Sequence, residues 1–520
     1  MMRYVPIAGG FFQYFSWGQV LWGIVLALIL GYTFQRAWSW EHGGKADLLF
    51  PGRYGRETYV LTAPTVFFWI LLIFFLLSIW YLGVQDGLLR FGAMMADVLL
   101  WLSIYYVLLL ILLPFLRRWF SARCCAVMWL VPIFLSWQGH MLFNTMALPR
   151  LSIYIPRNSF AVIGAVWLAG FLAVGGYYIL SHLLFYHRLM KRAFIEADPD
   201  ICAIMTHVQE ELVYWFPVKL LRADVSAPFS MGELNHTRCI VLPLRSYKPE
   251  ELSMIFLHEL HHLQRCDVNT KMFLCLCKAF CWFNPLVWIA VRKAADDLER
   301  SCDEIVTENM DSSKRKAYAH LLLDSAAPGR GFTTCLSAAA GTLHYRLQSV
   351  LKPRKPYLGT GILMVSLFIC VMCFGMISIS DMKGDLTSIL LQPDTDINYV
   401  FISGNPEGAK NPDISDHTDH SNDTEGSDSP DTAYIDWNDA ALRQELGRIE
   451  LAHIAGVRSP DAPAPNEEHM TFLLSDGRFA TLTDQALIIH DYHRYNVIAD
   501  CYLVQNKVDW GALKACFYEF

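Results

Sequence analysis

The strongest constraint on this chain is a series of apolar blocks, each close to the roughly 20 residues that a helix needs to cross a bilayer. The blocks cover residues 17–34, 61–84, 96–116, 126–143, 160–185 and 357–379. Charged residues make up only 18% of the chain, compared with about 25% in soluble domains. The sequence therefore predicts a polytopic α-helical membrane protein, with about five spans in residues 1–186 and a last span at 357–379.

Lysine and arginine are unevenly shared among the connections between these blocks. They concentrate after the first and third blocks, at Arg36, Lys45, Arg53, Arg56, Arg117, Arg118 and Arg123. Because connections rich in these residues stay in the cytoplasm, we expect the N-terminus outside and the segment 187–356 in the cytoplasm. One further span then places the C-terminal part of the chain outside.

The part that follows the last block divides by composition. Residues 380–431 are rich in Asp, Ser, Thr, Gly and Pro. Such a segment cannot bury enough apolar surface to fold, so we expect an acidic extracellular linker. Over residues 432–520 we expect a small extracellular α+β domain, with two strands around the turn Ser475–Gly477. Cys501 and Cys516 lie in this domain, and the sequence leaves their pairing open.

The stretch HELHH at residues 258–262 fits the pattern H-E-x-x-H. On a helix, His258 and His262 lie one turn apart on the same face and can hold one zinc ion between their imidazoles. Glu259 is one step round the helix, where it can act on an attacking water. Pro249 favours a helix start just upstream. His261 is interpreted as a polar residue that fills space beside the site.

A catalytic zinc site usually takes a third protein ligand, and the helical stretch 292–309 supplies candidates. Glu299 and Asp303 are four residues apart and share one helix face. One of them could bind the metal while the other accepts a proton from a ligand histidine. The alternative is that both belong to a solvated helix face. Asn284 and Pro285 interrupt the preceding apolar run, which predicts a helical hairpin.

Three segments, HELHHLQRCDVNTKMF, FNPLVWIAVRKA and DDLERSCDEIV, closely resemble the membrane-bound zinc metallopeptidases of the antirepressor type. This is the family of the penicillin-sensing and methicillin-resistance signal transducers. The resemblance implies that His258, His262 and Glu299 bind zinc (Zn2+). It also implies that Glu259 is the catalytic residue and that Asp303 supports the zinc site by contacting a ligand and not the metal.

The resemblance covers residues 225–306 well and also implies an organisation for the whole chain. Residues 187–356 are expected to form a cytoplasmic HExxH (gluzincin-like) zinc metallopeptidase domain in a multi-pass protein of a bacterial cell membrane. The domain at 432–520 is then a sensor for an unknown extracellular ligand. The output is cleavage of a cytoplasmic DNA-binding repressor, often accompanied by self-cleavage.

The chain departs from the penicillin sensors in two respects. It has five apolar blocks before the expected peptidase segment, whereas the resemblance to those sensors implies three. The outer part also lacks a penicillin-binding signature, because the S-x-x-K at residues 380–383 lies at the membrane edge and no K-T-G follows it. Acylation by a β-lactam is therefore not expected, and the activating signal is left open.

Two other functions stay open at this point. The chain could be a membrane receptor or scaffold with a non-proteolytic zinc domain, although Glu259 has no use in such a site. It could also be a general membrane-quality protease, although an outer domain behind a linker favours sensing. In each case the lipid membrane is a partner, direct nucleic-acid binding is not expected, and a homodimer is left open. Residues 238–242 are expected to form a strand that holds a peptide substrate by edge pairing.

Overall fold

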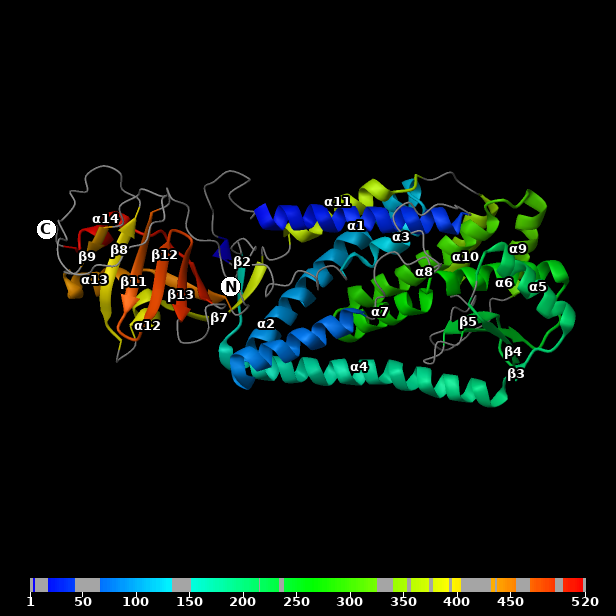
Figure 1. Ribbon diagram of the computed structural model, residues 1–520, viewed down its shortest axis with the longest axis horizontal. Coiled ribbons are helices and arrows are strands. Elements are labelled where there is room, and N and C mark those ends of the chain that lie inside the picture. The colour runs from blue at the N-terminus through cyan, green and yellow to red at the C-terminus, as the bar shows by residue number, and fades with distance from the viewer. Residues whose placement is uncertain are drawn as a thin grey trace, which may run out of the picture.

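The computed structural model describes most of the chain. The described residues are 3–4, 17–42, 66–132, 151–214, 216–232, 238–324, 340–352, 357–373, 377–391, 395–403, 432–434, 437–454, 468–491 and 499–517. Along the longest axis of the molecule a β-rich C-terminal part, a set of long helices and a smaller mixed α/β part follow one another (Figure 1).

Long apolar helices occupy the middle of the molecule. They are α1 (Trp17–Glu41), α2 (Val66–Trp119) and α4 (Arg157–Arg192), joined by the shorter apolar helix α11 (Thr360–Cys373). Among the described residues three segments are long and apolar enough to cross a membrane, namely Gln19–Glu41, Phe91–Trp119 and Val162–Arg192. Their exposed faces carry large apolar side chains, as expected for helices that contact lipid.

Helix α2 is two helical arms that fold back on each other. Gly83 separates the arms with a φ of 78°, a conformation that glycine adopts at little cost. The two arms contact each other across the turn. The Ser78 hydroxyl donates to the Gly87 carbonyl at 3.0 Å, and the rings of Phe75 and Phe91 are 5.1 Å apart. The second and third expected spans therefore correspond to the two arms of one hairpin.

The first and fifth expected spans correspond to α1 and α4, whereas those at 126–143 and 357–379 differ from the described structure. In the last one, α11 ends at Cys373 and residues 377–379 already belong to a strand. The block at 126–143 overlaps only α3 (Ala122–Met128), whose residues are all buried in protein, and residues 133–150 lie outside the described part. Helix α3 packs against α8 (Pro285–Thr307), and the Ala122 amide donates to Glu304 at 2.9 Å. This part of the block is therefore enclosed by other helices. Apolar composition alone could not distinguish such a helix from a span.

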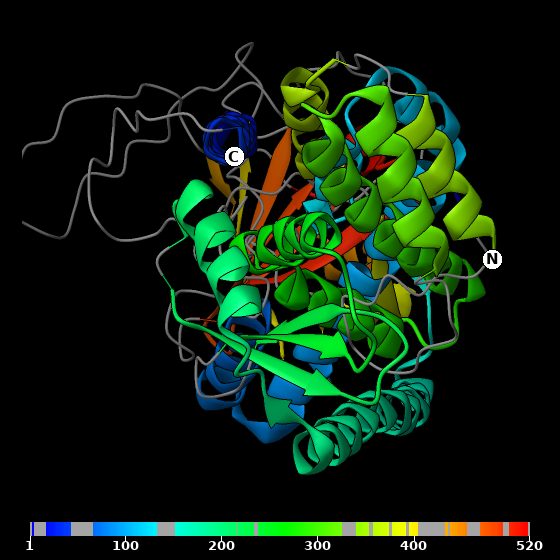
Figure 2. The ribbon, with the colours of Figure 1, turned by 90° about the vertical axis from the view of Figure 1, so that its right-hand side faces the viewer.

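Residues 187–356 contain a four-stranded sheet in the order β3-β4-β6-β5, with α6 (Pro249–Gln264) packed against β5 and α5 (Pro199–Glu211) packed against α6 (Figure 2). The strands are β3 (Phe194–Ile195), β4 (Val218–Ala223), β5 (Phe229–Gly232) and β6 (Arg238–Pro243). Strand β6 pairs with β4 on one side and with β5 on the other. Our expectation that residues 238–242 offer a free edge is therefore wrong, because β5 takes that edge position.

The C-terminal part is built on a ten-stranded sheet in the order β1-β2-β7-β10-β14-β13-β12-β11-β8-β9. Its strands are β1 (Arg3–Tyr4), β2 (Leu151–Tyr154), β7 (Ile377–Asp385), β8 (Ile397–Ser403), β9 (Thr432–Tyr434), β10 (Glu450–Ile454), β11 (His469–Leu474), β12 (Arg478–Thr483), β13 (Ala486–Asp491) and β14 (Ala499–Val504). Helices α12 (Leu386–Leu390), α13 (Asp439–Leu446) and α14 (Trp510–Lys514) share its core. The predicted turn at Ser475–Gly477 joins β11 and β12.

The linker expected at 380–431 is wrong for its first part. Residues 380–391 and 395–403 belong to the folded sheet and to α12, while residues 404–431 lie outside the described part. Leu386, Leu390 and Val400 are fully buried in the core of this domain. These few buried apolar residues are sufficient to anchor the segment in the fold. The acidic composition averaged over residues 380–431 did not reveal them. Cys501 and Cys516 form no disulfide with each other and belong to different core clusters of the described structure.

Candidate metal and catalytic site

Helix α6 (Pro249–Gln264) carries the histidine pair. It begins at Pro249, as the sequence predicts, and the Glu251 carboxylate accepts a hydrogen bond from the Lys248 amide at 3.0 Å. His258 and His262 lie one turn apart and are 1% and 0% exposed. Their Nε2 atoms are 3.1 Å apart. Two nitrogen lone pairs therefore meet at one buried point.

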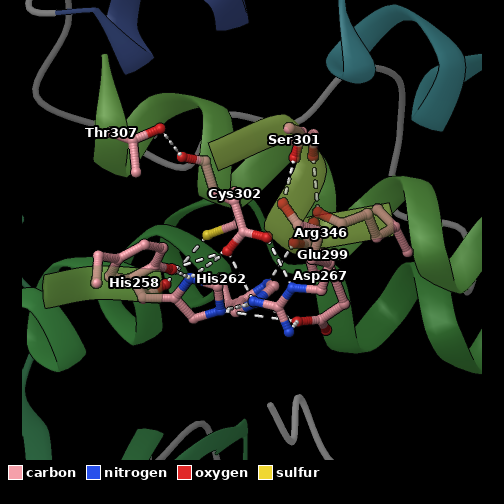
Figure 3. Close-up of polar contacts among 12 residues, drawn as sticks. His258, His262, Asp267, Glu299, Ser301, Cys302, Thr307 and Arg346 are labelled. Atoms are coloured by element: carbon pink, nitrogen blue, oxygen red, sulfur yellow. Dashed lines mark hydrogen bonds and ion pairs between the residues drawn. The ribbon is translucent and has the colours of Figure 1, made fainter. Parts of the chain in front are cut away.

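Helix α8 (Pro285–Thr307) supplies the predicted carboxylate. It begins after Asn284, whose side chain accepts a hydrogen bond from the Leu286 amide at 3.0 Å, and it forms the expected hairpin with α7 (Asp267–Phe280). This hairpin brings Glu299 beside α6, with Glu299 Oε2 at 3.7 Å from Nε2 of both histidines (Figure 3). The three residues that the family resemblance implies as ligands thus lie together.

The spacing of these three atoms fits a tetrahedral metal. Ligand atoms held about 2.0–2.1 Å from a tetrahedral zinc ion are about 3.3 Å from one another, and the observed separations are 3.1, 3.7 and 3.7 Å. Glu299 Oε2 is also buried and makes no hydrogen bond within the described structure, although Arg346 Nη1 forms an ion pair with it at 3.3 Å. A buried oxygen without a hydrogen bond is costly, and a bound cation would satisfy it.

The charges around the site point in the same direction. Burial alone would lower the pKa of His258, but Cys302 and Glu299 raise it to about 9. Burial raises the pKa of Glu299, but Lys271, whose Nζ lies 3.0 Å from Oε1, and His262 together hold it well below its usual range. The cluster therefore favours positive charge between the imidazoles and the carboxylate. A metal cation would take the place of the protons.

Cys302 is a fourth donor that the sequence analysis missed as a candidate. Its Sγ and one ring nitrogen from each of His258 and His262 lie within 4.8 Å of one another. The thiol also donates to the His258 carbonyl at 3.3 Å. Its position three residues after Glu299 on α8 is the only sequence signal that could have placed it here.

Asp267 fixes the orientation of His262, and the sequence analysis also missed it. Its Oδ2 accepts a hydrogen bond from His262 Nδ1 at 2.7 Å, which leaves the Nε2 lone pair pointing into the site. Arg265 in turn binds Asp267 at 2.8 Å. Cys266 has a φ of 53°, so the chain turns sharply after α6 and returns Asp267 to the histidine. Helical periodicity does not reveal that turn.

Asp303 is linked to His258 by hydrogen bonds through the hydroxyl of Tyr318. The Tyr318 hydroxyl lies between them, 2.9 Å from His258 Nδ1 and 2.8 Å from Asp303 Oδ1. Asp303 Oδ1 itself is 3.6 Å from His258 Nδ1. The hydroxyl donates to the carboxylate and so can accept from Nδ1. Asp303 therefore orients His258 through Tyr318, which comes from α9 (Ser312–Asp324).

Arg346, from α10 (Ala340–Leu351), ties the carboxylates of α8 together. Its guanidinium binds both oxygens of Asp303 at 2.7 Å and lies 3.3 Å from Glu299 Oε2. It is 0% exposed, so its charge is fully committed to these two acids. Tyr318 and Arg346 are far from the motif in sequence, and no local pattern marks them.

Glu259 and His261 are buried on the same helix, with exposed fractions of 0% and 2%. Burial lowers the pKa of His261 to about 3, with a further contribution from Arg265, so this imidazole is neutral. That state suits the space-filling role expected for it. Glu259 occupies the helical turn between the two cluster histidines.

Comparison with known proteins places this site in a recognised segment. Residues 149–350 match the family described as BlaR1 peptidase M56. Regulatory protein BlaR1 of Bacillus licheniformis is 27% identical over 183 residues, which are 35% of this chain and 30% of that protein. The chain thus spans less than a third of the length of this curated relative. Every residue of the cluster described above lies inside the family match.

Proposed function

We propose that this chain, whose residues 149–350 carry a peptidase segment of the BlaR1 M56 family, is a zinc metallopeptidase that transmits a signal across a membrane. One observation carries the proposal. His258, His262 and Glu299 bring three donor atoms to separations of 3.1, 3.7 and 3.7 Å in a buried site. The helices long enough to cross a membrane support the membrane setting.

We assign His258, His262 and Glu299 as the zinc ligands and Glu259 as the general base. When bound, zinc would polarise the scissile carbonyl and lower the pKa of a water molecule toward about 7. Glu259 takes a proton from the attacking water and delivers it to the leaving amine. Cys302 is not assigned as a ligand, because its thiol is hydrogen-bonded to the His258 carbonyl whereas Glu299 Oε2 has no hydrogen bond.

The substrate peptide is proposed to lie along β5. This strand is the edge of the four-stranded sheet as far as the chain is described, and α6, the helix of the two histidines, packs against it. An extended peptide can pair with such an edge through its backbone. Pairing there places a scissile bond beside the histidine pair without the need for a specific side chain.

The signal is proposed to pass along α4. Strand β2 belongs to the C-terminal sheet through parallel pairing with β7, and α4 begins three residues after the end of β2. At its other end α4 leads into β3, which pairs with β4 of the peptidase sheet. Trp167 of α4 also donates to the carbonyl of Phe280, at the end of α7, at 2.9 Å. One rigid helix thus joins the two sheets.

The basic residues after the first and third apolar blocks favour a cytoplasmic peptidase and an outward C-terminal sensor domain, in a bacterial membrane. The matched relative is a regulatory protein by its printed name. We therefore propose that an extracellular ligand of the sensor controls cleavage of a cytoplasmic DNA-binding repressor, and that self-cleavage accompanies activation.

Comparison of new protein N-termini in cells that express the wild type or the Glu259→Gln variant tests this function. The wild type is expected to produce new termini in a cytoplasmic DNA-binding protein and in itself, and the variant is expected to produce neither. New termini confined to proteins outside the membrane would contradict the proposed orientation. Identical termini in the two strains would contradict the peptidase.

A further inference from the structure

A second site lies where the membrane helices meet the peptidase. A cavity of about 1050 Å³ opens between the C-terminal ends of α1 and α2 and the helices α8, α9 and α10. Figure 1 shows α10 and α8 on the side of the molecule where α1 ends. None of the residues that line the cavity belongs to the donor cluster of the peptidase site. The cavity is therefore a separate feature of the fold.

The cavity is strongly basic. Its cationic side chains are Arg117, Arg118, Arg123, Arg300, Arg315 and Lys352, and the carboxylates among its described lining residues are Glu304 and Glu308. Glu304 is paired with Arg300 at 3.3 Å, and Glu308 lies 3.3 Å from His42, so at most two negative charges oppose six positive ones. The wall therefore carries an excess of positive charge.

Three of these cations lack a carboxylate partner among the described residues. Arg117 binds Asp297 at 2.8 Å and Arg123 binds Glu41 at 2.6 Å. Arg315 bonds only to backbone carbonyls, and no ion pair involves Arg118 or Lys352 within the described part of the chain. Converging guanidinium and ammonium groups of this kind suit the oxygens of a phosphate.

The cavity also lies at the end of a helix that is long and apolar enough to cross a membrane. The span Phe91–Trp119 ends here, and Arg118 stands at its end. On the same helix the face formed by Ile111, Phe115 and Trp119 is 69%, 57% and 45% exposed. An apolar lipid-facing stripe thus runs directly to the mouth of a basic cavity. Free phosphate would make no contact with that apolar stripe, whereas the acyl chains of a phospholipid would cover it.

We propose that this cavity binds the phosphate headgroup of an anionic phospholipid, with the acyl chains along the Ile111–Phe115–Trp119 face of α2. Basic cavities beside cytoplasmic helix ends are suited to such headgroups. Arg118 and Lys352 contribute charge that nothing else in the described structure neutralises.

The same wall adjoins the peptidase site. Tyr345 lies between two guanidinium groups, 4.5 Å from Arg117 and 4.8 Å from Arg300 by ring centroid. Arg300 directly follows Glu299, and Tyr345 directly precedes Arg346 in the chain. A headgroup bound here would therefore hold α8 and α10 in place around the donor cluster. This consequence, unlike the binding itself, rests on the proposed function.

Native mass spectrometry of the full-length protein, released from vesicles of phosphatidylcholine and phosphatidylglycerol, tests the binding. The wild type is expected to retain phosphatidylglycerol selectively. The Arg118→Gln/Lys352→Gln variant is expected to bind it at least about tenfold more weakly, because two charge-assisted hydrogen bonds are lost. Lys316→Gln is the matched control, since Lys316 is exposed and does not line the cavity. It is expected to bind like the wild type.

Three outcomes would overturn the proposal. Equal lipid retention in the wild type and the double variant would show that Arg118 and Lys352 do not bind the headgroup. If lipid binding is weakened equally in Lys316→Gln, the effect arises from the overall charge of the protein and not from the cavity. If inorganic phosphate added in excess displaces the lipid, or binds with the same affinity, the ligand is free phosphate and not a membrane lipid. If the double variant does not fold, Lys352→Gln alone applies the same test, because that side chain is exposed. None of these readouts requires peptidase activity.

Discussion

Replacement of Glu259 by glutamine is expected to lower the rate of peptide-bond cleavage about a hundred- to ten-thousandfold, the range that a positioned general base contributes. The amide keeps the shape of the side chain, which is 0% exposed, but it cannot take a proton. The fold and the zinc content are expected to stay those of the wild type, because Glu259 is not one of the assigned ligands. The measurement is single-turnover cleavage of a peptide by full-length protein in vesicles.

Glu250→Gln is the matched control for this experiment. It makes the same chemical change on the same helix, at an exposed position in the first turn, and is expected to cleave at the wild-type rate. A Glu259→Gln protein that cleaves as fast as the wild type would show that Glu259 is not the base. Loss of zinc from that variant would instead show that Glu259 is a ligand.

Replacement of Arg346 by methionine is expected to destabilise the peptidase part by about 3–5 kcal/mol, because it leaves a buried acid without its counter-charge. Arg346 binds both oxygens of Asp303 at 2.7 Å and lies 3.3 Å from Glu299. For a segment of this size the change corresponds to a melting temperature lower by roughly 10 °C. Thermal unfolding of the full-length protein in detergent, followed by circular dichroism, measures it.

Arg292→Met and a double variant make this prediction sharper. Arg292 is an exposed arginine on α8, so its replacement is expected to change the melting temperature little. Arg346→Met/Asp303→Asn removes both members of the pair and is expected to cost less than the sum of the two single changes, as for any coupled buried pair. If Arg346→Met unfolds at the same temperature as Arg292→Met, the ion-pair network does not hold the site together.

The sequence predicted those elements whose signals are local. Pro249 begins α6, Asn284 caps α8, and the turn at Ser475–Gly477 joins two strands, because each of these residues acts on its immediate neighbours. Elements fixed by distant contacts escaped prediction. Residues 450–454 form β10 because β7 and β14 flank them in the sheet, and both partners are distant in sequence.

The candidate site divides in the same way. His258, His262 and Glu299 could be proposed together because a motif and a family resemblance mark them. Asp267 could not, since the left-handed turn at Cys266 returns it to the site. Tyr318 and Arg346 come from two further helices whose packing no local pattern encodes. They contact His258, Asp303 and Glu299, and only the folded chain shows this.

X-ray absorption at the zinc edge of the purified full-length protein tests the central claim most directly. The assigned ligands predict one zinc per chain with a first shell of nitrogen and oxygen at about 2.0–2.1 Å and no sulfur at about 2.3 Å. His262→Ala is expected to lose most of the metal. Absence of zinc from the wild type would contradict the account. A sulfur neighbour that disappears in Cys302→Ser would show that the thiol, and not Glu299, completes the site.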